Sequence, residues 1–153
     1  MHSLTYGDPK RWLHSSGGDW THDALDKLLN VLSNPFKPPL LDLGCGNGRW
    51  SSYYPEGWVG LDIGNVPEGC VRGVAQHLPF TNDLFQTVIA VTVVQHVPFA
   101  EKDSVYGEVK RVLRPGGLFI IVEGDADIGN DYLWNMRWQK QAEALSLYFK
   151  VFG

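Results

Sequence analysis

The fold of this chain is decided by the stretch Leu40-Leu41-Asp42-Leu43-Gly44-Cys45-Gly46-Asn47-Gly48-Arg49. A short apolar run that carries one acid leads directly into three glycines spaced two residues apart. Parallel strands present ligands at their carboxyl ends, and backbone without a Cβ can approach a ligand closely there. The stretch therefore predicts a buried strand followed by a cofactor-binding loop.

A second short apolar run ends in a carboxylate at Val59-Gly60-Leu61-Asp62-Ile63. In nucleotide-binding α/β sheets an acid at about this distance from the glycines meets the ribose hydroxyls. The common dinucleotide fingerprint has its third glycine one position later than Gly48, where this chain has Arg49. That difference argues against a nicotinamide enzyme.

Composition and charge exclude several further classes of protein. A chain of 153 residues is the size of one domain, and a net charge of -4 disfavours broad nucleic-acid binding. The two cysteines form no disulfide framework, the first residues do not resemble a signal peptide, and no apolar run has membrane-spanning length. We therefore predict a cytoplasmic protein that does not enter membranes. No histidine or cysteine set has metal-ligand spacing, so no metal is predicted.

Hydrophobic periodicity predicts alternating strands and helices. Strands are predicted at about 40–43, 57–62, 70–74, 85–94 and 118–123, with a turn at Arg114-Pro115-Gly116-Gly117. Helices are predicted at about 47–54, around 105–113 and at about 131–148, and before the first strand along the stripe Ala24, Leu25, Leu28, Leu29 and Leu32. The alternation predicts a doubly wound, mainly parallel α/β sheet with right-handed crossovers.

We predict a single domain over residues 1–153. Residues 1–37 form a helical cap or lid, 38–124 the cofactor-binding core, and 125–153 a C-terminal helix. The strand at 118–123 would then be an open apolar edge. The tail helix, a protein partner or a second copy of the chain would cover it, or the sequence is a fragment that continues past Gly153.

Three blocks resemble one enzyme family. They are Leu41–Gly48, Leu78-Pro79-Phe80 and Glu108–Gly117, and they occur in the family's order. On these blocks the region of about 38–124 resembles the class I S-adenosylmethionine-dependent methyltransferases, in the type 11-like subgroup with a Leu-Pro-Phe turn. The resemblance implies S-adenosylmethionine as cofactor and a Rossmann-like sheet of strand order 3-2-1-4-5.

The resemblance also implies roles for the glycine loop. Gly44, Gly46 and Gly48 would pack their backbone against the methionine part of the cofactor, and Cys45 belongs to the same loop. Asp42 would lie near the cofactor ammonium.

Further cofactor-binding roles fall on the later strands. Asp62 would accept hydrogen bonds from both ribose hydroxyls, and Ile63 would lie against the adenine face. Ala75 and Gln76 would meet the adenine edge, and the Val91 carbonyl would face the methionine end.

The chain departs from the family pattern in three places. Val74 stands where an acid usually binds the adenine amino group, and Gln76 is the candidate substitute. The segment between Asp62 and Val74 is too short for a helix, which predicts a loop. The family's two terminal strands, one of them antiparallel, are not found in the sequence.

The residues beyond the cofactor site allow more than one interpretation. His96 follows the fourth predicted strand and is either a catalytic base or a histidine hydrogen-bonded within its loop. Aromatic residues near the N-terminus would form a lid and acceptor pocket: Tyr6, Trp12 and Trp20. One charged group is predicted to be a solvated helix face: Glu101, Lys102, Asp103, Glu108, Lys110 and Arg111.

Our first hypothesis is a methyltransferase with a small-molecule acceptor. A sulfonium methyl is already activated, so an aligned nucleophile suffices and no triad is needed. One alternative is a tRNA wobble-uridine-type methyltransferase that needs an activating partner, suggested by Ile89-Ala90-Val91 and Gln95-His96. The other is a non-catalytic cofactor-binding or structural subunit of a complex. The sequence Val91-Thr92-Val93-Val94 disfavours base-amino methyltransferases.

Overall fold

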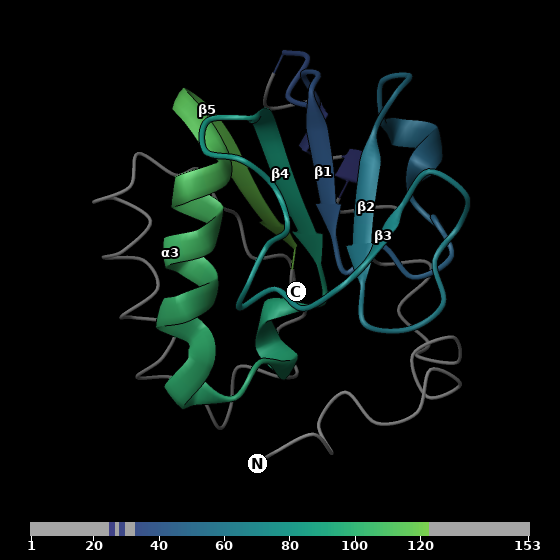
Figure 1. Ribbon diagram of the computed structural model, residues 1–153. Helices are drawn as coiled ribbons and strands as arrows, with labels where there is room; N and C mark the ends of the chain where they lie inside the picture. The colour runs from purple at the N-terminus through teal and green to yellow at the C-terminus, as the bar shows by residue number, and fades with distance from the viewer. Residues whose placement is uncertain (1–24, 27, 30–32, 123–153) are drawn as a thin grey trace.

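The computed structural model describes residues 25–26, 28–29 and 33–122 (Figure 1). Five parallel strands form one sheet in the order β3-β2-β1-β4-β5. The strands are β1 (Leu40–Leu43), β2 (Val59–Asp62), β3 (Val71–Arg72), β4 (Phe85–Val91) and β5 (Leu113–Val122). The helices with complete bounds are the α-helix α3 (Lys102–Val112) and the 3-10 helices η1 (Ser51–Tyr53), η2 (Val94–His96) and η3 (Phe99–Glu101), and residues 25–26 and 28–29 are also α-helical. The predicted Rossmann-like order 3-2-1-4-5 is confirmed.

The chain reverses its direction of winding next to β1. It passes from β1 outward through β2 to β3, then returns across β1 to β4 and continues to β5. In such sheets ligands bind outside the carboxyl ends of the strands at this switch point. The topology therefore places any ligand site beyond β1, where β4 and β2 flank it.

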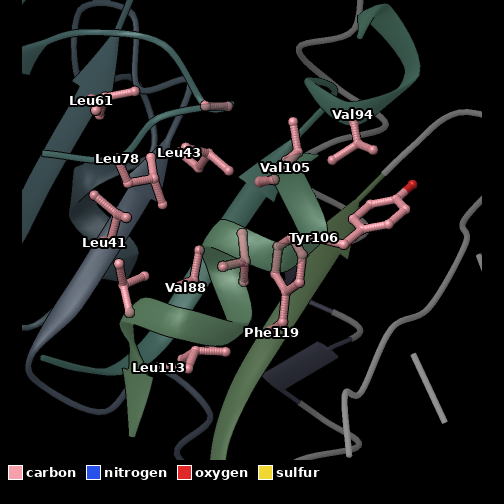
Figure 2. Close-up of a cluster of buried hydrophobic side chains, with 14 of the residues drawn as sticks. Leu41, Leu43, Leu61, Leu78, Val88, Val94, Val105, Tyr106, Leu113 and Phe119 are labelled. Carbon is pink, nitrogen blue, oxygen red and sulfur yellow. The ribbon is translucent and has the colours of Figure 1, made fainter. Parts of the chain in front are cut away.

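One face of the sheet packs against α3. Because successive residues of a strand point to opposite faces, Leu41 and Leu43 share this face with Val88 and Phe119. Figure 2 shows Val105 and Tyr106 of α3 among these side chains. Each fully buried apolar side chain contributes roughly 1.5–3 kcal/mol. This packing holds the parallel strands in register.

The opposite face carries a second, more aromatic core. Leu25 and Leu28 are buried there together with Phe36, Trp50 and Tyr54. They cover the residues of β1, β4 and β5 that point to this face of the sheet: Leu40, Ile89, Val91, Ile120 and Val122. Both faces of β4 are thus buried, as its continuous apolar sequence predicts. Leu29 is 42 % exposed, so its predicted place in the apolar stripe is wrong.

Several predicted boundaries differ from the structure. The predicted helix at 47–54 is wrong, because this segment consists of turns followed by η1. The strand predicted at 85–94 ends at Val91, since Thr92 adopts a φ of 56° that an extended strand does not allow. The loop predicted between Asp62 and Val74 is confirmed apart from the two-residue β3.

The last strand begins earlier than predicted. Leu113 already pairs with Phe85, and regular pairing resumes at Leu118 opposite Thr87. Arg114, Pro115 and Gly116 are exposed, and Gly116 has a φ of 77°, so this stretch is an irregularity within β5 rather than a turn before it. Residues 1–24 of the predicted cap or lid at 1–37, and the tail helix predicted at 131–148, lie outside the described residues.

Candidate functional site

The carboxyl ends of β2, β1 and β4 meet at one level. Leu43 pairs with Leu61, and Asp42 pairs with Ile89. One residue further along the β1–β2 pair, Gly44 is level with Asp62. Two residues further along the β1–β4 pair, Gly44 is level with Val91. The structure thus brings the start of the glycine loop, the strand-end acid and the end of β4 to the switch point.

Hydrogen bonds fasten the glycine loop, residues 44–48, to the end of β2. The amides of Gly44 and Cys45 both donate to the Leu61 carbonyl, at 2.7 and 3.1 Å. The Gly46 amide donates to Asp62 Oδ2 at 2.9 Å, and the Gly64 amide donates to Asp62 Oδ1 at 2.9 Å. The Asp62 carboxylate therefore holds both the glycine loop and the turn that follows β2. Each of its oxygens keeps a second acceptor direction for a ligand hydroxyl.

Two glycines of the loop are required for different reasons. Gly44 has a φ of 79°, and a Cβ there would lie 2.3 Å from Val93 Cγ2. Gly46 has a φ of 51°, and a Cβ there would meet no atom of the described residues within 4 Å. Gly44 is thus needed for internal packing, whereas Gly46 presents bare backbone to open space. This is a cradle of the kind that fits an approaching cofactor.

Asp42 is buried beneath this loop. It lies on the aromatic face of β1 and is 1 % exposed, and neither carboxylate oxygen has a hydrogen-bond partner of normal geometry within the described part of the chain. Burial raises its pKa to about 7, the nearby Tyr54 hydroxyl lowers it, and the Asp62 charge raises it. The Tyr54 hydroxyl is itself buried, and among the same described residues it too lacks a partner of normal geometry. A buried, uncompensated acid is costly, so it points to a function.

The residues predicted at the adenine edge follow β3. Asp62 pairs with Arg72, whose Nε donates to the Ile63 carbonyl at 3.0 Å. Beyond this pair, Ala75 is buried and Gln76 is partly buried between the bridged residues Val74 and His77. Val74 is 41 % exposed. Ile63, Ala75 and Gln76 thus follow the adjacent ends of β2 and β3.

The turn at Leu78–Asn82 is clamped by helix α3. Arg111 donates from Nη2 to the Leu78 carbonyl at 2.9 Å and from Nη1 to the Phe80 carbonyl at 2.7 Å and Asn82 Oδ1 at 2.9 Å. Glu108 accepts from Arg111 Nε and, at 3.1 Å, from the Leu78 amide. This contact with Arg111 lowers the Glu108 pKa.

The clamp corrects the prediction of a solvated charged face on α3. Glu108 and Arg111 bind the turn, and Lys102 is only 2 % exposed. Glu101, Asp103 and Lys110 are exposed, as predicted. The clamp fixes the segment that follows Ala75 and Gln76.

His96 lies at the end of η2, beyond β4. Its amide donates to the Val93 carbonyl at 3.0 Å, and its side chain is partly buried. Between β4 and η2, Thr92 has a φ of 56°, which is rare for a β-branched residue, and its amide donates to the Val122 carbonyl at 2.7 Å. Such strain is concentrated at functional sites.

No sequence signal indicated the contributions of Tyr54, Thr92 and Val93, which carry no motif of their own. The contribution of the Glu108–Arg111 pair did have a signal, because the two residues stand at i,i+3 spacing inside one of the family blocks.

No helix in the described part of the chain is long and apolar enough to cross a membrane. Among those same residues, no group of three or more acidic, histidine or cysteine side chains could hold a metal ion.

Replacing Gly44 or Gly46 with alanine is expected to destabilise the fold to different extents. Gly44→Ala should lower the free energy of unfolding by about 2–4 kcal/mol, because it adds a clash with Val93 to an unfavourable φ. Gly46→Ala should cost only about 1 kcal/mol. Urea unfolding measures both, and equal losses would contradict the packing difference. Gly44→Ala/Val93→Ala should recover the part of the loss that the clash causes.

Replacing Arg111 with lysine is expected to loosen the clamped turn. Lysine keeps the charge but cannot donate to the Leu78 and Phe80 carbonyls at the same time, as the guanidinium does. The free energy of unfolding should therefore fall by about 1–3 kcal/mol. Thermal unfolding measures the change. Lys110→Ala, at an exposed neighbouring position, is the matched control and should shift it by less than about 0.5 kcal/mol. Equal effects of the two variants would contradict the clamp.

A family model described as a methyltransferase domain matches residues 41–121. The uncharacterized methyltransferase sll0829 of Synechocystis sp. is 34% identical over 97 residues, covering 55% of this chain and 46% of that protein. The phthiotriol/phenolphthiotriol dimycocerosates methyltransferase 1 of Mycobacterium ulcerans is 31% identical over 120 residues, covering 61% and 44%. The chain thus spans less than half the length of these relatives.

Solved structures share the fold. The BH2331 protein of Bacillus halodurans C-125 matches with a TM-score of 0.59 at 22% identity, over 80% of this chain and 68% of that one. The PH0226 protein of Pyrococcus horikoshii OT3 matches with a TM-score of 0.53 at 27% identity, over 77% and 61%.

Proposed function

Because the chain belongs to the methyltransferase-domain family, in the class I S-adenosylmethionine-dependent group, we propose that it transfers a methyl group to a small-molecule acceptor. One observation carries the proposed site. The Asp62 carboxylate fastens the Gly46 amide at the switch point, and Gly46 presents bare backbone to open space. This is an arrangement in which ribose hydroxyls and a methionine backbone could be bound side by side.

The proposed cofactor contacts follow the order of the strands. The loop of Gly44, Gly46 and Gly48 holds the methionine part, with Cys45 as part of its rigid backbone. Asp42 lies below the loop as the acid nearest the ammonium. The remaining proposed contacts are the ribose acid and the residues around the adenine and the methionine end: Asp62, Ile63, Ala75, Gln76 and Val91.

The cofactor would supply an electrophilic methyl group on sulfur. The chain's own contribution is to align the acceptor and exclude water. We propose His96 as the base that takes a proton from the acceptor, because it follows β4, whose end lies level with Gly44 at the proposed methionine site. Replacing His96 with alanine is expected to slow methyl transfer about 100-fold without changing affinity for S-adenosylhomocysteine. Unchanged transfer would instead make it a residue that is only hydrogen-bonded in its loop.

Calorimetry with S-adenosylmethionine and S-adenosylhomocysteine tests the cofactor proposal. Saturable binding at one site per chain is expected, and its absence in well-folded protein would overturn the proposal. Methyl-labelled cofactor with fractionated small molecules then tests the acceptor. Binding without any transfer would favour the non-catalytic subunit.

The names of the relatives support a small-molecule acceptor. Besides the Mycobacterium protein, a sterol 24-C-methyltransferase of Schizosaccharomyces pombe is 43% identical over 53 residues, covering 35% of this chain and 14% of that protein. We accordingly propose sterol-like or phthiotriol-like small molecules as the first acceptor class to test.

An activator-dependent methyltransferase is the second candidate. One structure with this fold is a complex between the Haloferax volcanii Trm112 methyltransferase activator and a methyltransferase, with a TM-score of 0.52 at 17% identity. Among the described residues, β5 pairs on one side only, which leaves an edge that a partner or a second copy could cover. Transfer to RNA only after addition of such an activator would favour this candidate. Transfer to small molecules by the isolated chain would exclude it.

A further inference from the structure

The side chains of the chain's two cysteines, Cys45 and Cys70, both lie next to Gly60. A Cβ on Gly60 would lie 2.5 Å from Cys45 Sγ and 3.0 Å from Cys70 Sγ. Because both distances start from the same point, the two sulfur atoms cannot be further apart than their sum. Gly60 is thus the residue that leaves room for both thiols.

The backbone supports this placement. Leu61 pairs with Val71, so the preceding residues Gly60 and Cys70 stand opposite each other across the β2–β3 pair. Paired strands are only about 4.8 Å apart. Cys45 reaches the same place from the glycine loop, because its amide donates to the Leu61 carbonyl. Burial raises the pKa of Cys45, and the charges of Asp42 and Cys70 and a hydrogen bond with the nearby Cys70 thiol raise it further.

We propose that Cys45 and Cys70 are a redox-active thiol pair that a low-molecular-weight disulfide oxidises to an intramolecular disulfide. The bond would fasten the glycine loop to the chain just before β3. Both cysteines are free thiols in this structure. The bond requires the two sulfurs to approach to about 2.05 Å, and the contacts at Gly60 already limit their separation to the sum of their distances from a Cβ there.

The two thiols have different parts in the reaction. Cys70 is partly exposed, so its thiolate attacks first, and the small disulfide breaks to release one thiol and leave a mixed disulfide on Cys70. Cys45 is 3 % exposed and then attacks the Cys70 sulfur, releasing the second small thiol. The chain loses two electrons and two protons, and the small disulfide gains both.

Oxidised glutathione tests the proposal on the whole chain. After incubation, alkylation and digestion with trypsin, mass spectrometry should find the peptide containing Cys45 linked to the one containing Cys70. Cleavage after Arg49 separates the two cysteines, so a linked pair reports the bond. The oxidised protein should remain monomeric on a non-reducing gel, with its Tm raised until a reductant is added.

Two variants sharpen the result. Cys45→Ser should keep glutathione on Cys70 as a persistent adduct, whereas the wild-type chain should release it. Cys70→Ser should resist glutathione, because only the buried thiol remains. A persistent glutathione adduct on wild-type Cys70, a disulfide between two chains or an unchanged Tm would each overturn the proposal.

Discussion

Replacing Asp62 with alanine is expected to weaken the binding of S-adenosylhomocysteine by about 100-fold or more. The variant loses two charge-assisted bonds, from the amides of Gly46 and Gly64, each worth roughly 1.5–3 kcal/mol. It would also lose the proposed bonds to the ribose hydroxyls. Loop position and ligand contact thus depend on the same carboxylate. Isothermal calorimetry measures the affinity.

Controls must separate loss of the ligand contact from loss of the fold. Glu68→Ala removes an exposed carboxylate from the loop between β2 and β3 and should leave both affinity and unfolding unchanged. Asp62→Asn keeps the size of the side chain but offers only one acceptor oxygen, so an intermediate affinity is expected. If folded Asp62→Ala bound within about threefold of wild type, Asp62 would serve the turn alone.

The strands that build the site were predictable because their sequence patterns are local. β1 and β4 are short apolar runs buried on both faces, and β2 ends at the acid that the spacing indicated. The positive φ values of Gly44, Gly46 and Gly48 likewise follow from residue type. The family resemblance supplied the strand order, which periodicity alone does not determine.

The errors arose where distant contacts decide the local structure. The segment at 47–54 contains no early helix breaker except Gly48, yet its aromatic residues turn inward: Trp50 and Tyr54 are buried against the sheet. Arg111 was predicted to be solvated because it is a charged residue on a helix. Its carbonyl partners come from a turn about thirty residues earlier in the chain. The Cys45–Cys70 neighbourhood depends on β2–β3 pairing. None of these contacts leaves a periodic trace in the sequence.

Asp42 makes the folded protein sensitive to pH. Its pKa is raised by burial from 3.8 to about 7, so the native state holds this proton more tightly than the unfolded chain. Stability should therefore fall as pH rises from about 4 to about 7, and this loss should be complete above that range. Three pKa units correspond to about 4 kcal/mol, which sets the scale of the effect.

Replacing Asp42 with asparagine is expected to remove that pH dependence. At pH 8 the variant should be more stable than wild type by about 1–3 kcal/mol, since part of the gain is offset by a buried amide without partners. Near pH 4 the two should converge. Urea unfolding at both pH values measures this, with the exposed Glu56→Gln as the matched control. A variant less stable than wild type at pH 8 would contradict the assignment.

The same acid should make cofactor binding depend on pH in the opposite direction. If the ammonium of the ligand lies near Asp42, binding favours the ionised carboxylate and lowers its pKa. Affinity for S-adenosylhomocysteine should then rise with pH toward a plateau above about 7, by up to tenfold per unit below it. Asp42→Asn should bind more weakly at pH 8 with little pH dependence over this range, although it is the more stable protein. A destabilising acid retained beneath the glycine loop is explained only by such a gain on binding, so parallel pH profiles for wild type and variant would remove that explanation.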